Sequence, residues 1–265
     1  MPAPHPTDTS EDMTAIGLAV CVLGTPEAVA VARRCGYDFL VVDMEHGPIT
    51  VNAAAAICVA GQMGGFPVYV RVTGPASPDL ARVLDCGATG VIIPHVDSLD
   101  DAREIVRRTR FPATGERALP GAIAHFGFEP VDAVTMVREA EPATRVIAMI
   151  ESRSGLADAA AIAALDGIDA LMIGSNDLAA AMGHLGALGH EEVLGAFRAI
   201  AGAAHASAKG FGAMGLPEPL VASHARDLGA SLLVATNEIN LIADGGRAVL
   251  GRYRDLTARQ DAAAA

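Results

Sequence analysis

The chain contains no tryptophan, and aromatic residues make up only 4% of its 265 residues. Ala, Val, Ile and Leu must therefore fill the core, which suits a barrel interior and the helices packed around it. Lys and Arg are also scarce, at 19 against 31 Asp and Glu, so the formal net charge is −12. We therefore expect neither nucleic acid nor an anionic membrane surface as a partner.

Disulfide, targeting and membrane signals are absent as well. The chain has four scattered cysteines with no Cys-x-x-Cys pair: Cys21, Cys35, Cys58 and Cys86. This spacing favours small buried thiols in a reducing cytoplasm. The start of the chain lacks the basic residues and apolar run of a signal peptide, and no apolar stretch reaches membrane-spanning length. We expect a cytoplasmic protein with disordered tails over residues 1–12 and 257–265.

Eight short apolar runs, each expected to be a strand, alternate with helical segments over residues 13–256. The runs cover residues 15–23, 39–45, 67–72, 90–96, 145–151, 170–174, 211–215 and 231–235. This alternation predicts an α/β fold, a single-domain (β/α)8 TIM barrel. A doubly wound open sheet is the alternative, but no strand is followed by Gly-x-Gly-x-x-Gly. The irregular stretch 111–128 is long for a compact domain, so we expect a lid or a subunit contact there.

The second strand runs directly into Asp43, Glu45 and His46, and Gly47-Pro48 then ends the segment. Three ionisable side chains cannot all be buried without partners, so we place them at the carboxyl ends of the barrel strands, where barrel enzymes build their sites. The alternative is a strand end capped by solvated charges. His46 is the best candidate for a general base, because an imidazole can take and return a proton near neutral pH.

Two further acidic residues end neighbouring strands. Glu151 closes the fifth strand and Asp177 follows the sixth, so their carboxylates can converge on a divalent cation such as Mg²⁺ or Mn²⁺. Alternatively, Asp177 caps the following helix and Glu151 pairs with Arg153 or Arg71. The backbone N–H groups of residues 174–177 open a helix, which suits the carboxylate of a 2-oxo acid that chelates the metal.

Arg71 and His95 lie at the ends of the third and fourth strands. Arg71 always carries its charge and can stabilise an enolate as it forms on a keto oxygen. The alternative for Arg71 is an ion pair with Asp43 or Glu45. We expect His95 to support other residues or to be structural. The single lysine, Lys209, precedes the seventh strand and is a poor Schiff-base candidate.

The order and spacing of short motifs along the chain are more specific than any one motif. The motifs are Val41-Val42-Asp43-Met44-Glu45-His46, Val70-Arg71-Val72, Leu84-Asp85-Cys86-Gly87, Ile92-Ile93-Pro94, Gly115-Glu116-Arg117, Ile150-Glu151-Ser152 and Ile173-Gly174-Ser175-Asn176-Asp177-Leu178, with Met182-Gly183. From about residue 14 to residue 253, the chain resembles the HpcH/HpaI aldolases, a family of class II, metal-dependent pyruvate aldolases.

The resemblance implies a divalent metal ion, Mg²⁺, Mn²⁺ or Co²⁺, on Glu151 and Asp177, and no organic cofactor. It implies that Arg71 contacts the keto oxygen of the substrate. The substrate carboxylate is expected at a four-residue segment: Gly174, Ser175, Asn176 and Asp177. Relatives often have Gly-Pro-Ala-Asp in this segment and a Gln in place of Met149. These departures concern donor and acceptor specificity more than the type of reaction.

The resemblance also implies an assembly. In the family, the last helix packs on a neighbouring subunit, commonly in a hexamer, so we expect a homo-oligomer. Proton transfer is placed at His46, which Asp43 supports locally. An acidic residue matching Asp85 approaches this histidine from the adjacent subunit, although a surface position at a helix end is the plain alternative for Asp85.

These observations together predict a carbon–carbon lyase. It would reversibly cleave a 4-hydroxy-2-oxo acid to pyruvate, or a close 2-oxo acid, and an aldehyde. The nearest rival is a citrate lyase β-subunit or malyl-CoA type of lyase acting on a CoA thioester, but those enzymes usually carry Arg-x-Asn where this chain has Arg71-Val72-Thr73. A barrel that only binds an acid would be expected to lose part of the metal pair, Arg71 or His46, and all are present. The aldehyde, the donor acid and the native metal stay open.

Overall fold

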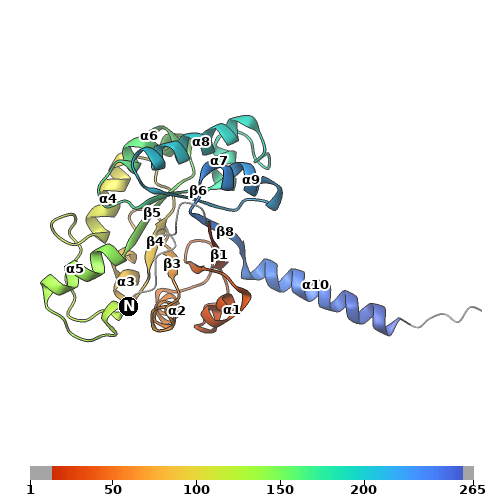
Figure 1. Cartoon of the computed structure of the whole chain (residues 1–265), viewed down its shortest axis with the longest axis horizontal. Coiled ribbons are helices and arrows are strands. Elements are labelled where there is room, and N and C mark those ends of the chain that lie inside the picture. The colour runs from red at the N-terminus through yellow and green to blue at the C-terminus, as the bar shows by residue number, and fades with distance from the viewer. Residues whose placement is uncertain (1–13, 259–265) are drawn as a thin grey trace, which may run out of the picture.

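A computed structural model describes residues 14–258 of the chain. Its eight strands are parallel and close into a barrel in sequence order, which confirms the predicted (β/α)8 fold (Figure 1). The strands are β1 (Ala15–Val20), β2 (Phe39–Asp43), β3 (Val68–Arg71), β4 (Gly90–Ile93), β5 (Arg145–Ile150), β6 (Ala170–Gly174), β7 (Gly210–Met214) and β8 (Leu232–Asn237). The expected tail 1–12 lies outside the described residues, as do residues 259–265 of the expected tail 257–265, whereas Thr257 still belongs to the last helix.

Helices surround the barrel and return the chain to the start of each next strand. They are α1 (Glu27–Cys35), α2 (Val51–Gly64), α3 (Leu80–Asp85), α4 (Leu99–Thr109), α5 (Ala133–Ala143), α6 (Arg153–Ala163), α7 (Ser175–Ala181), α8 (Glu191–Ala206), α9 (Val221–His224) and α10 (Glu238–Thr257), with 3₁₀ turns η2 (Ala124–Phe126), η3 (Glu218–Leu220) and η4 (Arg226–Leu228). Side chains cap several helices, as Thr50 does at α2 and Ser98 at α4. Helix α1, in contrast, begins after Pro26 without a side-chain cap.

Alternation along the strands decides which residues enter the barrel. Phe39 and Val41 of β2, Tyr69 of β3 and Met149 of β5 belong to one buried cluster inside the barrel, while the residues between them pack against the helices. The rings of Phe39 and Tyr69 meet edge to face, with centroids 5.5 Å apart. Gly17 leaves room for this pair, because a Cβ there would lie 2.2 Å from the Phe39 ring. Two of the few aromatic residues of the chain thus fill the interior of the barrel.

The same alternation carries polar residues to one end of the barrel. Asp43 continues the alternation of Phe39 and Val41, so its side chain points into the barrel as theirs do. In the sheet, Asp43 is paired with Arg71 of β3. Glu151 follows Met149 in the same parity, immediately after β5. Side chains at every second position point to the same face of a strand, so these three groups enter the carboxyl-end opening of the barrel.

Two segments lie outside the barrel itself. The stretch 111–128, predicted to be irregular, contains only the 3₁₀ turn η2, and Arg117 covers the Phe111 ring at 4.4 Å. The 20-residue helix α10 projects away from the barrel (Figure 1), and Glu238 is its only buried residue. Among residues 14–258, no helix is long and apolar enough to cross a membrane. The cysteines are free, and only Cys58 is fully buried.

Candidate active site

A buried ion pair forms the base of the carboxyl-end opening. Arg71 Nε and Nη2 donate to the two carboxylate oxygens of Asp43 at 3.0 and 2.6 Å. Arg71 Nη1 lies 3.0 Å from Glu45 Oε2. Burial alone would raise the pKa of Asp43, but the hydrogen bonds and charge of Arg71 outweigh burial and hold this pKa below its usual value. The ion pairs weighed as the alternative role of Arg71 are therefore present, and they fix the guanidinium in place.

His95 connects Glu45 with Glu151. Its Nε2 lies 2.8 Å from Glu45 Oε1, and its Nδ1 lies 3.5 Å from Glu151 Oε2. The backbone N–H of His95 also donates to Glu151 Oε2 at 2.9 Å. His95 has φ 57°, a left-handed conformation that is uncommon outside glycine and is found at functional sites. The sequence had suggested only a supporting or structural role, and the structure places His95 between two acidic groups of the site.

Glu151 is buried beside a glycine that makes room for it. A Cβ on Gly174 would lie 2.2 Å from Glu151 Oε1, so the carboxylate occupies the space above this residue. Burial raises the pKa of Glu151, and the negative charges of Glu45 and Asp177 raise it further, while His95 opposes the rise. Acidic charge therefore accumulates here, which is the electrostatic situation that a bound cation relieves.

Two alternatives for the acidic pair, Asp177 as a helix cap and Arg153 as the partner of Glu151, do not agree with the structure, whereas the charge of Glu151 does act on Arg71 and helps to raise its pKa. Asp177 is the third residue of α7 and is exposed, whereas Gly174 occupies the N-cap position without a side-chain cap. The Arg153 guanidinium donates to the carbonyls of Ala181 and Met182. Arg153 is thus engaged at the far end of α7, away from the role of a Glu151 partner.

His46 stands at the rim of the opening. Its side chain is 61% exposed, and Nε2 lies 3.7 Å from Glu45 Oε2. Asp43 contacts His46 through the backbone, since the His46 N–H donates to Asp43 Oδ1 at 3.3 Å. The local support expected from Asp43 therefore acts on the main chain, and Glu45 is the carboxylate beside the imidazole.

The segment Gly174–Asp177 borders a second part of the opening. Ser175 is buried, and its hydroxyl donates to the Met214 carbonyl at 2.7 Å. Asn176 is exposed and lines a cavity of about 330 Å³ together with Thr236 and Asn237. Of the polar side chains expected to bind substrate here, Asn176 faces open space and Ser175 does not.

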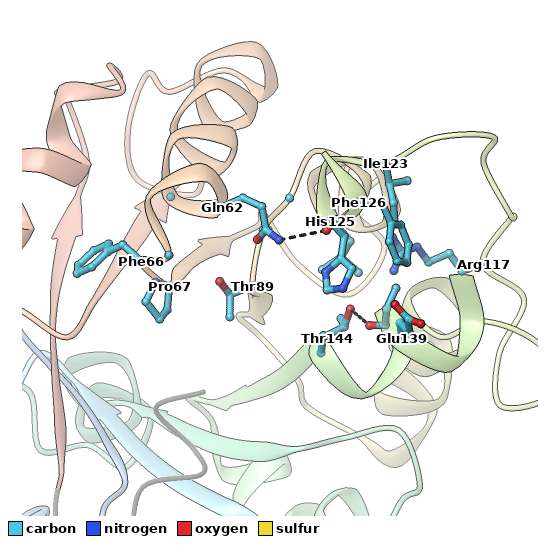
Figure 2. A pocket seen from close by; sticks show the side chains of 17 residues that line it. Gln62, Phe66, Pro67, Thr89, Arg117, Ile123, His125, Phe126, Glu139 and Thr144 are labelled. Carbon is cyan, nitrogen blue, oxygen red and sulfur yellow. Dashed lines mark hydrogen bonds between the residues drawn. The ribbon is translucent and has the colours of Figure 1, made fainter. Parts of the chain in front are cut away.

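Asp85 lies away from the other predicted site residues. It is the last residue of α3, and since α3 leads from the carboxyl end of β3 to the start of β4, it stands at the opposite end of the barrel. Arg117 Nη2 donates to Asp85 Oδ1 at 2.6 Å. Arg117 also lines a cavity of about 320 Å³ at this end, together with His125 and Glu139 (Figure 2). Within one chain, Asp85 is therefore not brought to His46.

One further acidic residue near the site was not expected from the sequence. Glu238, at the start of α10, accepts backbone N–H groups of Cys21, Val22 and Leu23 at 2.9, 2.5 and 3.0 Å. Burial, together with the charges of Asp43 and Glu238, raises the pKa of the Cys21 thiol to about 12. Cys21 is therefore a protonated neighbour of Asp43 and not a nucleophile.

A parallel barrel with acidic, basic and imidazole groups at the carboxyl ends of its strands defines a barrel-enzyme type of site. The family model of HpcH/HpaI aldolase/citrate lyase matches residues 21–245. The chain therefore belongs to the HpcH/HpaI aldolase/citrate lyase family, which confirms the resemblance seen in its motifs.

Individual relatives agree with this assignment. The chain is 34% identical over 247 residues to a hydroxypyruvate/pyruvate aldolase of Delftia acidovorans, which covers 91% of this chain and 89% of the relative. It is 32% identical over 239 residues to a 4-hydroxy-4-methyl-2-oxoglutarate aldolase of Hapsidospora irregularis, covering 88% of each. The crystal structure of an HpcH/HpaI aldolase from Desulfitobacterium hafniense DCB-2 matches with a TM-score of 0.84 at 25% identity, over 92% of this chain and 93% of that chain.

Proposed function

We propose that this protein is a divalent-metal-dependent 2-oxo acid aldolase. It cleaves a 4-hydroxy-2-oxo acid reversibly to pyruvate, or a close 2-oxo acid, and an aldehyde. The observation that carries the proposal is the buried Glu151 carboxylate, which lies among Glu45, His95 and Asp177 at the end of the barrel that holds Arg71. Relatives named as pyruvate and 4-hydroxy-4-methyl-2-oxoglutarate aldolases support the reaction type.

The residues of the site fit a hard divalent cation. Glu151 and Asp177 offer carboxylate oxygens, the ligand type that Mg²⁺ and Mn²⁺ prefer. Glu45 Oε2 is buried and forms an ion pair with Arg71 Nη1 at 3.0 Å, but it accepts no hydrogen bond within the described residues. A bound cation would polarise the 2-oxo group as a Lewis acid. We expect Glu151 and Asp177 to hold it, with Mg²⁺, Mn²⁺ or Co²⁺ as candidates.

Arg71 is suited to hold the negative charge that develops on the substrate. A guanidinium has five N–H donors; the hydrogen bonds to Asp43 use two of them, and Nη1 is in an ion pair with Glu45. The remaining donors can face the keto oxygen, where enolate charge appears as the C3–C4 bond breaks. Because Asp43 and Glu45 already fix the side chain, little reorganisation is needed during the reaction.

His46 is the proposed site of proton transfer. The ring is exposed at the rim and stands beside Glu45, so a water can connect it with a 4-hydroxyl group. In cleavage, His46 takes the hydroxyl proton as the C3–C4 bond breaks and the aldehyde leaves. The enolate that remains is then protonated at C3 to give pyruvate.

We also propose that the active protein is a homo-oligomer, with a hexamer as the expected form. Asp85 can assist His46 only if it comes from a neighbouring copy, because it lies at the other end of its own barrel. Helix α10 supports assembly, since it carries many exposed apolar side chains. These side chains are Ile239, Leu241, Ile242, Val249, Leu250, Tyr253 and Leu256.

The first experiment measures pyruvate release from a panel of 4-hydroxy-2-oxo acids before and after EDTA, with Mg²⁺, Mn²⁺ or Co²⁺ added back. Cleavage should vanish with chelator and return with metal, and Glu151→Gln should abolish it. Cleavage that survives chelation would exclude the carboxylate pair as the metal site. Turnover of a CoA thioester without cleavage of any free acid would instead assign the protein to the citrate lyase side of its family.

A further inference from the structure

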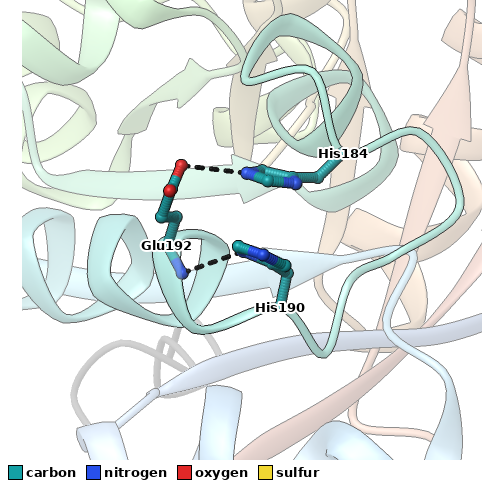
Figure 3. A group of neighbouring side chains, drawn as sticks. All are labelled: His184, His190 and Glu192. Atoms are coloured by element: carbon teal, nitrogen blue, oxygen red, sulfur yellow. Dashed lines mark hydrogen bonds and ion pairs between the residues drawn. The ribbon is translucent and has the colours of Figure 1, made fainter.

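A pair of stacked histidines lies between α7 and α8, apart from the carboxylates of the proposed active site. The rings of His184 and His190 are 3.7 Å apart between centroids and 19° from parallel. Glu192, in the first turn of α8, places its Oε2 2.9 Å from His184 Nε2 (Figure 3). One donor atom from each residue lies within 4.8 Å of the others, and no other such His, Cys, Asp or Glu trio occurs in residues 14–258.

Both imidazoles face the same residue. His184 Nε2 meets the Glu192 carboxylate, and His190 Nδ1 accepts the Glu192 backbone N–H at 3.2 Å as the cap of α8. The Glu192 backbone N–H occupies the lone pair of His190 Nδ1, so an ion bound at Nδ1 would replace this hydrogen bond. Three residues of one short segment thus bring their donor atoms close together at the protein surface.

The backbone around these side chains is held by its own hydrogen bonds. The His184 N–H donates to Ala179 at 2.8 Å, the Ala187 N–H to His184 at 2.8 Å, and the His190 N–H to Ala187 at 2.9 Å. The histidine positions are therefore fixed relative to both helices before any ligand binds. His190 and Glu192 are exposed, so their side chains can still rotate.

We propose that His184, His190 and Glu192 form a second metal site, which takes a borderline divalent transition ion of the Zn²⁺ class. Two imidazoles and a carboxylate match the ligands of Zn²⁺, whereas Mg²⁺ prefers an all-oxygen shell. Bond lengths of about 2.0–2.2 Å require the donor atoms to approach to roughly 3.4 Å, which side-chain rotation supplies. Water completes the shell.

The bound ion would fasten α7 to α8. Asp177, a proposed ligand of the active-site metal, lies in the first turn of α7, and His184 follows the last turn of α7. An ion bound to His184 would therefore restrict the movement of this helix. The charge of Arg153 also acts on Glu192 and opposes a second cation. Surface exposure of the trio also weakens binding. We therefore expect micromolar affinity, as in a regulatory or stabilising site.

The test is a calorimetric titration of the tag-free full chain with ZnCl₂. The chain carries Glu151→Gln and Asp177→Asn to remove the carboxylate pair, and circular dichroism verifies its fold. One Zn²⁺ should bind per chain, and Mg²⁺ should give no binding. The visible absorption of bound Co²⁺ gives an independent measure of coordination at the same site.

Variants of the trio decide the assignment. His184→Gln and Glu192→Gln keep hydrogen-bonding groups, and His190→Asn keeps a good helix cap while losing the imidazole. Each should weaken Zn²⁺ binding at least 10-fold, because it removes one of three protein ligands. His205→Gln, at an exposed histidine near the end of α8, is the matched control and should leave the affinity unchanged.

Two results would overturn the proposal. One is an absence of Zn²⁺ binding up to millimolar concentrations in the chain that lacks the carboxylate pair. The other is binding that His184→Gln and His190→Asn do not weaken. Neither result depends on catalysis, so the site can fail while the aldolase proposal stands, and the converse also holds.

Discussion

Replacing Gly174 by alanine would displace the Glu151 carboxylate without altering its chemistry. The new Cβ would lie 2.2 Å from Glu151 Oε1 and 2.8 Å from its Cδ, and both are side-chain atoms that can give way. The oxygen must therefore move by about 1 Å to reach an ordinary contact distance. The backbone of Gly174, at φ −83° and ψ 96°, is open to alanine, so the fold should survive.

The expected effect of Gly174→Ala is large because active-site geometry tolerates little error. A misplacement of about 1 Å can cost on the order of 100-fold in rate. We expect kcat/KM for pyruvate release to fall about 100-fold and Mn²⁺ binding, measured by calorimetry, to weaken in parallel. Gly195→Ala in α8 meets nothing within 4 Å and is the matched control, with unchanged activity. Metal affinity and activity within about twofold of wild type in a folded Gly174→Ala variant would refute the placement of Glu151 at the metal.

Further variants probe charge and assembly. Arg71→Met leaves two buried carboxylates without their partner, so urea unfolding should show a loss of about 3–5 kcal/mol; a loss below about 1 kcal/mol would contradict burial of the pair. Because the folded pKa of Asp43 is depressed, its stabilising effect is present above its unfolded value of about 4 and is lost as pH falls through the folded value. The stability difference between wild type and Asp43→Asn should therefore shrink below about pH 4, and a constant difference would refute this. Because the folded pKa of Glu151 is raised, ionisation opposes folding as pH rises through that value. Metal-free Glu151→Gln should therefore have a higher Tm than metal-free wild type at pH near 7. An equal or lower Tm would contradict the accumulation of negative charge around Glu151. Leu250→Glu on α10 should shift the protein to smaller assemblies in light scattering, and an unchanged mass would remove α10 from the interface.

The sequence predicted the barrel because two local signals agree. Apolar runs of strand length alternate with helical segments, and Asp43, Arg71 and Glu151 each stand at the end of a predicted strand. Both signals are local in the chain, so no tertiary information was needed. Gly174 was expected in the site, but its steric role toward Glu151 depends on side-chain placement that parity alone does not supply.

The remaining features depend on contacts between distant segments. His95 follows β4, whose neighbour β5 leads to Glu151, and it also reaches Glu45 after β2 across the opening; its left-handed backbone is indicated by no motif. Glu238 reaches the loop after β1 only because the barrel closes between β8 and β1. The role predicted for Asp85 lies beyond what a single chain can show, since it requires a second copy of the chain.

Proton exchange at pyruvate C3 is the most direct test of the central claim, because it needs no knowledge of the aldehyde. Incubated in D₂O with Mg²⁺ or Mn²⁺, the protein should replace the methyl protons of pyruvate by deuterium, as followed by NMR. The account predicts that exchange stops with EDTA, returns with metal, and is lost in Glu151→Gln and Arg71→Met. Exchange that persists in folded Glu151→Gln, or no exchange by the metal-loaded wild-type protein, would contradict enolate formation at this site.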